Sequence, residues 1–65
     1  MEHKIVITDE NGFIQSIDHK EGVFSMSIVE LLDEMAGSGW KLLQINSFVN
    51  DKKSTRIQYT LISVC

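Results

Sequence analysis

The sequence predicts an α+β domain with the element order ββαββ, in which one helix packs on one face of an antiparallel sheet. Three observations lead to this class. An Asn-Gly pair separates two short β-rich runs, one amphipathic segment carries helix start and stop signals, and two long apolar runs follow it around a polar turn. The chain of 65 residues, 1–65, forms a single domain at most.

The first 18 residues predict a β-hairpin. Residues 4–8 are rich in β-branched side chains, and residues 13–18 alternate apolar with polar side chains. Between them, Asn11-Gly12 favours either a two-residue type I′ turn or a three-residue loop with Gly12 in the left-handed conformation. The two loops give different strand registers, and the sequence leaves the register open. The polar residues 19–22 are expected to connect the hairpin to the helix.

The segment from Ser27 to Gly37 predicts an amphipathic helix. Ser27 and Glu30 form the S-x-x-E capping box, and Met26 with Leu31 suits the hydrophobic staple at the same end. Gly37 is expected to end the helix in the left-handed conformation. The apolar side chains that recur with the spacing of one helix face are Ile28, Leu31, Leu32 and Met35.

Residues 40–49 and 55–64 predict two long strands joined by the polar turn 50–54. Strict alternation along the first strand puts Leu43, Ile45 and Val49 on one face and Trp40, Leu42 and Phe48 on the other. The second strand carries Ile57, Tyr59 and Leu61 on one face and Ile62 and Val64 on the other.

Both of these strands carry apolar residues on both faces, whereas one helix covers only one face of a sheet. A helix of ~10 residues is about 15 Å long, so the other face stays open. The open apolar side predicts an interface with a second copy or with a different protein. The alternative is that these side chains lie at the sheet ends under loops. The candidate interface residues are Trp40, Leu42, Phe48, Ile62 and Val64.

The composition narrows the classes of partner. Nine acidic and six basic residues give a net charge of −3, which disfavours the nucleic-acid backbone. Cys65 is the only cysteine, so no internal disulfide stabilises the small core, and a homo-oligomer, above all a dimer, is expected. No apolar run is long enough to cross a bilayer, and the N-terminus does not resemble a signal peptide. We therefore expect a cytoplasmic protein without a membrane partner.

Residues 31–43, LLDEMAGSGWKLL, resemble a small domain family of unknown function from bacteria and their phages. That family shows a Leu-rich helix, a Gly-containing link, Gly-Trp-Glu-Leu-Val and a β-hairpin. The likeness covers residues 28–60, and its specific element is Gly39-Trp40 followed by a charged residue and Leu42. Lys41 stands where the family usually has glutamate, and the N-terminal hairpin exceeds its usual single leading strand. The resemblance implies a small β-rich fold and no catalytic residues.

No catalytic, cofactor-binding or metal site is predicted. His3 and His19 lack metal-ligand spacing, and Cys65 has no evident base beside it. The Gly-Ser-Gly at 37–39 follows a helix C-terminus, whereas phosphate-binding loops precede a helix N-terminus. We therefore expect no enzyme activity.

Two charged groups each allow a functional and a structural interpretation. The first, an acidic docking face or a solvated helix face, comprises Glu30, Asp33 and Glu34. The second, a weak nucleic-acid patch or a solubilising hairpin tip, comprises Lys52, Lys53 and Arg56 with Tyr59 nearby.

The favoured function is a small non-enzymatic regulatory domain that acts through protein–protein contacts. Small size, acidic charge and the family resemblance suit a phage or mobile-element inhibitor of a host defence protein. One alternative is a homo-oligomer that binds a small ligand in a pocket at the subunit interface. The other is a weak nucleic-acid-binding protein.

Overall fold

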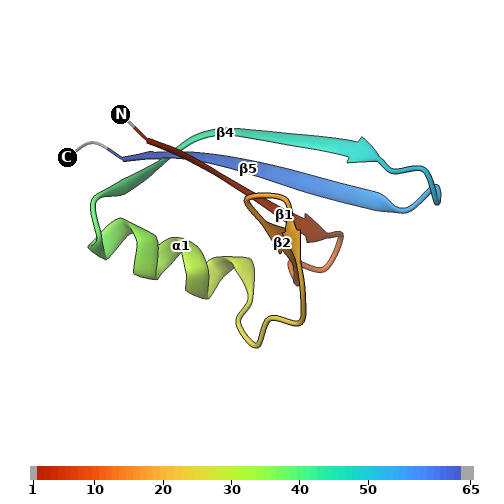
Figure 1. Ribbon diagram of the computed structural model, residues 1–65, viewed down its shortest axis with the longest axis horizontal. Coiled ribbons are helices and arrows are strands. Elements are labelled where there is room, and N and C mark those ends of the chain that lie inside the picture. Colours follow the sequence, from red (N-terminus) through yellow and green to blue (C-terminus); the bar gives the residue numbers. More distant parts are fainter. Residues whose placement is uncertain (1, 64–65) are drawn as a thin grey trace.

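The computed structural model describes residues 2–63, in which one α-helix accompanies a single five-stranded antiparallel sheet (Figure 1). The elements in chain order are β1 (His3–Asp9), β2 (Ile14–Ile17), β3 (Lys20–Glu21), α1 (Ile28–Gly37), β4 (Trp40–Val49) and β5 (Thr55–Ser63). The strand order in the sheet is β3-β2-β1-β5-β4, so β1 and β5 are central neighbours. β3 and β4 form the two edges.

The α+β class is confirmed, but the predicted order ββαββ is wrong because a third strand precedes the helix. The polar residues 19–22, which the sequence predicts to be a connection, contain β3, and β3 forms a second hairpin with β2. Asp18 and His19 have φ values of 52° and 68°, and a type I′ turn requires positive φ at both central residues. Ile17 pairs with Lys20 across this turn. No glycine marks it, so the usual hairpin signal is missing.

β1 and β2 form the predicted hairpin with the three-residue loop. Gly12 has φ 86°, and its N–H donates to the Asp9 carbonyl at 3.2 Å. Asp9 Oδ1 also accepts the backbone N–H groups of Asn11 and Phe13, both at 2.9 Å. A left-handed glycine with a local acceptor is the geometry of a bulged loop. The resulting cross-strand pairs are Val6–Ile17, Ile7–Ser16 and Thr8–Ile14.

The β4–β5 turn repeats the β1–β2 loop. Asn50 Oδ1 accepts the backbone N–H of Lys52 at 3.0 Å and that of Ser54 at 2.9 Å, as Asp9 does in the first loop. The fourth residue is again left-handed, but here it is Lys53, with φ 60°, in place of a glycine. A side chain in this conformation costs roughly 1–2 kcal/mol. The two loops therefore have the same hydrogen-bond pattern and differ at the fourth residue, where Lys53 is strained and Gly12 is not.

α1 begins at the predicted cap. Ser27 Oγ accepts the backbone N–H of Glu30 at 3.5 Å, and the bonded pair satisfies one of the free donors of the first turn. α1 ends at Gly37, as predicted, but the expected left-handed conformation of this residue is wrong: Gly37 is helical, and the positive φ of 88° falls on Gly39. Ser38 N–H donates to the Met35 carbonyl at 3.0 Å and closes the last turn. Gly39 then turns the chain into β4.

The apolar core lies between α1 and the face of the sheet that we call the helix side. Val6 and Leu61 come from the central strands, and Ile28 and Leu31 come from α1. With Ile14 these are the buried apolar residues among residues 2–63, and a core of this size supplies only ~3–5 kcal/mol. The half-buried side chains packed around it are Ile17, Phe24, Met26, Leu32, Met35, Trp40 and Tyr59.

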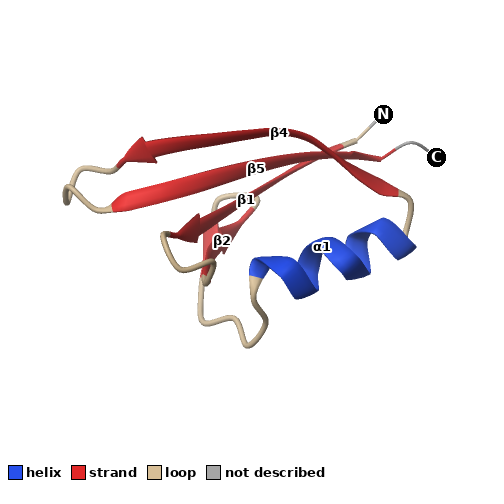
Figure 2. Cartoon of the chain, turned by 180° about the vertical axis from the view of Figure 1, so that it is seen from behind, coloured by secondary structure: helices blue, strands red, loops and turns tan. Residues whose placement is uncertain are grey.

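The β4–β5 hairpin extends beyond the helix. α1 runs under the half of the sheet where β4 begins, and the half that ends in the β4–β5 turn has no helix across it (Figures 1 and 2). The molecule measures 37 × 22 × 18 Å. It exposes 4649 Å², about 10% more than the roughly 4,200 Å² expected of a compact protein of 7.4 kDa. The distal hairpin therefore has strand neighbours but no second layer.

Candidate functional site

β4 is an edge strand whose apolar side chains are exposed to solvent. It pairs only with β5, and every residue from Lys41 to Val49 is exposed. The exposed fractions of its large apolar side chains are Leu42 42%, Leu43 57%, Ile45 53%, Phe48 38% and Val49 65%. Native proteins normally shorten, charge or cover such an edge, because its unpaired backbone groups accept another strand. We call residues 42–49 the β4 edge.

A β-bulge at Leu43 reverses the alternation of side chains along β4. Leu42 pairs with Leu61 and Gln44 pairs with Thr60, so Leu43 has no partner on β5. The extra residue moves all later side chains to the opposite face. Residues 40, 42, 45, 47 and 49 consequently share the helix side, because their partners are residues 63, 61, 59, 57 and 55. The predicted grouping of Leu42 with Phe48 is therefore wrong.

The five predicted interface residues lie in different environments. Trp40 is half-buried and packs against the core. Leu42 is exposed on the helix side of the β4 edge. Phe48, exposed, and Ile62, half-buried, lie on the opposite face of the sheet, which we call the open face. Val64 lies outside the described residues.

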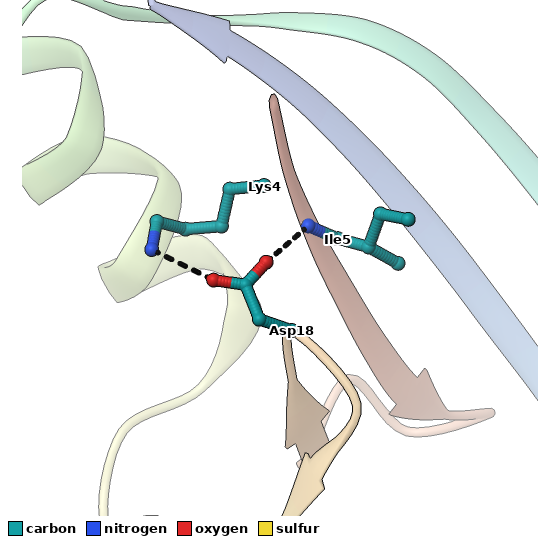
Figure 3. Close-up of polar contacts among 3 residues, drawn as sticks. All are labelled: Lys4, Ile5 and Asp18. Carbon is teal, nitrogen blue, oxygen red and sulfur yellow. Dashed lines mark hydrogen bonds and ion pairs between the residues drawn. The ribbon is translucent and has the colours of Figure 1, made fainter. Parts of the chain in front are cut away.

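Lys4 of β1 lies over the ring of Trp40 and is itself paired with Asp18 of the β2–β3 turn. The Lys4 ammonium lies 5.4 Å from the centre of the Trp40 ring. It also lies 3.1 Å from Asp18 Oδ2, and Figure 3 shows this ion pair. Asp18 Oδ1 accepts the Ile5 backbone N–H at 3.0 Å, and Asp18 N–H donates to the Ile5 carbonyl at 2.7 Å. A cation over an indole ring contributes about 0.5–1 kcal/mol at an exposed site. Trp40 is therefore a structural anchor for the start of β4.

The Asp18 carboxyl is stabilised in its charged form. The hydrogen bond from the Ile5 N–H lowers the pKa of Asp18 below its ordinary value of 3.8; partial desolvation opposes this shift, and Lys4 and His19 reinforce it. A lowered folded-state pKa means that the contribution to stability is present above the unfolded pKa. It is lost as the pH falls through the folded-state pKa.

We expect Asp18→Asn to flatten the acid dependence of stability. The wild type should lose stability between pH 5 and pH 3, and the variant should lose less, by up to about 1 kcal/mol, since exposed ion pairs contribute ~0–1 kcal/mol. Asparagine keeps an acceptor oxygen and tolerates positive φ, so only the charge changes. Urea denaturation at both pH values measures the difference. Asp33→Asn on the exposed helix surface is the control, and an equal acid loss in wild type and Asp18→Asn would contradict the assignment.

The β4 edge lacks the charged residues and prolines that normally keep an edge strand from pairing with another chain. No charged residue and no proline occurs from Leu42 to Asn50. Lys41, just before this stretch, is the only charge on β4, and the bulge at Leu43 lies at the end nearest α1. The distal part of the edge is thus uncharged, regular and open.

The predicted acidic face is exposed on α1. Glu30, Asp33 and Glu34 are all exposed, and the only ion pair among residues 2–63 is Lys4–Asp18. No basic residue occupies the last helical turn. Docking of a basic partner therefore stays a prediction, beside the alternative of a solvated helix face.

The residues of the predicted basic patch lie on both faces of the sheet. Arg56 pairs with Phe48 on the open face, whereas Tyr59 lies on the helix side and packs against the core. Arg56 and Lys52 instead line an open cleft of about 640 Å³. Its other lining residues are Gln15, Glu21, Gly22, Asn50 and Asp51. Charges of both signs meet in this cleft, so the basic side chains do not form the continuous stripe typical of nucleic-acid binding.

Residues 2–63 contain no group of three His, Cys, Asp or Glu side chains placed to hold a metal ion. His3 starts β1 and His19 lies in the β2–β3 turn. Within residues 2–63, the single helix does not combine the length and the apolar character needed to cross a membrane.

No protein-family model, curated protein or solved structure matches this chain. The candidate site is therefore defined by the residues of this chain alone. Of its members, Leu43, Ile45 and Val49 are absent from the predicted interface, because strict alternation assigned them to the opposite face. The uncharged run from Leu42 to Asn50 is the sequence signal that points to them.

Proposed function

We propose that this chain is a non-enzymatic protein-binding domain and that the β4 edge is its contact surface. One observation carries the proposal: the longest apolar strand of the fold, β4, is at an edge, and every residue of this strand after Trp40 is exposed. A stable domain normally buries such a strand, and contiguous exposed apolar surface is typical of a contact site.

Strand addition is the mode of binding that suits this surface. A partner strand laid beside β4 satisfies the free backbone N–H and C=O groups, and the exposed side chains on both faces supply the apolar contact. Main-chain hydrogen bonds then provide affinity, and alternate side chains provide specificity. A regulatory or inhibitory role, as expected from size and charge, follows if the captured strand belongs to a functional surface of the partner.

The test compares an edge variant with a matched variant elsewhere. Ile45→Lys puts a charge into the β4 edge, and Val29→Lys puts the same charge on α1, where Val29 is 72% exposed. The tagged proteins are purified gently from their own host cells and examined by native mass spectrometry. We expect a second chain, either a different protein or another copy of this one, bound at fixed stoichiometry to wild type and Val29→Lys, and its loss with Ile45→Lys.

Two results would contradict the proposal. One is a wild-type chain recovered as a bare monomer. The other is a partner retained at full stoichiometry by Ile45→Lys while circular dichroism shows the variant to be folded.

A further inference from the structure

We propose that the partner of the β4 edge is a second copy of this chain, paired antiparallel about a two-fold axis at Ser47. This inference rests on the proposed function and specifies its partner. It follows from the direction of the backbone groups, the distribution of side chains and the size of the core.

The direction of the backbone groups is fixed by the β4–β5 turn. Asn50 N–H donates to the Ser54 carbonyl at 3.0 Å, so Asn50 directs its backbone groups toward β5. Backbone groups alternate along a strand. The N–H and C=O of residues 45, 47 and 49 therefore point away from β5 and are free to pair with another strand.

The position of the bulge selects the register. A two-fold axis at Ser47 pairs Ile45 of each copy with Val49 of the other and pairs the two Ser47 residues with each other. These three residue pairs make about six backbone hydrogen bonds. Moving the axis to Asn46 or Ile45 brings the bulged Leu43 into the ladder and leaves about four bonds or fewer. The register at Ser47 is thus the longest regular ladder available to two copies.

The side chains of this register are self-complementary. Ile45, 53% exposed, meets Val49 of the second copy, 65% exposed, on the helix side. Cross-strand pairs of β-branched residues stabilise a sheet by roughly 0.2–1 kcal/mol each. On the open face Asn46 meets Phe48. No charged residue occurs in the ladder, so like charges do not oppose each other across the axis.

The size of the surface suits a dimer of a small chain. The five exposed side chains of the β4 edge present apolar surface on the order of 400 Å² per copy. Residues 45–49 form the ladder and Leu42 and Leu43 lie beside it, so with the paired backbone the contact is on the order of 1,000 Å² in total, at the small end of specific interfaces. Residues 2–63 bury five apolar side chains, and a small core of this kind is commonly stabilised by self-association.

Sedimentation equilibrium of the purified full chain tests the inference. We expect a dimer for the wild type and for Ser47→Ala, and a monomer for Ser47→Pro, which removes one outward N–H at the axis while leaving the bonds to β5 intact. Circular dichroism checks that Ser47→Pro is folded. If it is not, Ile45→Lys replaces it, with Val29→Lys as the control that stays dimeric.

Cysteine cross-linking tests the register. In a Cys65→Ser background, Ser47→Cys places two thiols across the axis at a Cα separation of about 5.5 Å, within the range that a disulfide spans. We expect a covalent dimer on mild oxidation. Gln44→Cys, three positions from the axis, should give none.

The outcomes separate this inference from the proposed function. A monomeric wild type overturns the second copy as partner, but the proposed function survives if Ile45→Lys releases a different protein from host extracts. A wild-type dimer that persists in folded Ser47→Pro and is not cross-linked by Ser47→Cys places the dimer contact elsewhere and overturns the inference. Failure of both experiments to show any β4-dependent contact removes the inference and the proposed function together.

Discussion

Replacing Leu61 with alanine should lower the free energy of unfolding by about 3 kcal/mol, because truncation of a buried leucine removes transfer free energy and leaves a cavity. Leu61 is 1% exposed and lies on the central strand β5, between Lys4 of β1 and Leu42 of β4. A domain of this length has a stability of ~3–10 kcal/mol. The substitution therefore removes a large share of the total, and a substantial unfolded population is expected at 37 °C.

Urea denaturation followed by far-ultraviolet circular dichroism measures the effect of Leu61→Ala. Val29→Ala is the control, because Val29 is 72% exposed on α1 and alanine favours helix. The control should change stability by less than about 0.5 kcal/mol. A loss below about 1 kcal/mol for Leu61→Ala would mean that the sheet closes over the missing side chain and that the core is less rigid than described.

Gly12→Ala should destabilise the fold by about 1–2 kcal/mol, the usual cost of a side chain in the left-handed region. Gly12 has φ 86°, and a Cβ at this position would lie 3.3 Å from Ile28 Cγ2, a buried core atom. The Gly12 carbonyl also accepts the Ile28 N–H at 2.9 Å, so the strain is passed to the start of α1. Denaturation in urea measures the loss.

Lys53→Gly provides the reverse experiment in the matching loop. Lys53 occupies the same left-handed position with φ 60°, and glycine should relieve its strain and raise stability by about 0.5–1 kcal/mol. Part of the relief is offset by the greater freedom of glycine in the unfolded chain. Equal and unchanged stabilities for Gly12→Ala and Lys53→Gly would contradict the description of both loops.

The local elements could be predicted from the sequence because their signals are local. Asn11-Gly12 marks the first loop, and Ser27 with Glu30 marks the helix start; both signals act within a few residues. The β2–β3 turn has the same need for positive φ, but Asp18 and His19 meet it without a glycine, so residues 19–22 resemble a linker. Lys53 takes the place of glycine in the β4–β5 loop, so the usual sequence signal of a bulged loop is missing there too.

The candidate surface could be predicted only in part because it depends on contacts between distant segments. Apolar residues on both faces of the last two strands correctly indicate more apolar surface than one helix can cover. Which of them are exposed depends on the placement of β4 at the edge and on the bulge at Leu43. Neither is visible in an alternating pattern, and the bulge exchanges the faces of Ile45 and Phe48.

The central position of β1 beside β5 has a consequence for how the chain reaches its native state. The β1–β2–β3 meander and the β4–β5 hairpin each form from neighbouring residues, whereas His3 meets Ile62 only after nearly the whole chain has been closed into a loop. Pairings between distant residues carry the largest entropy of closure and slow the search. The docking of two preformed halves along β1 and β5 is accordingly the expected rate-limiting event of folding, and it forms the central β1–β5 ladder in a single cooperative step.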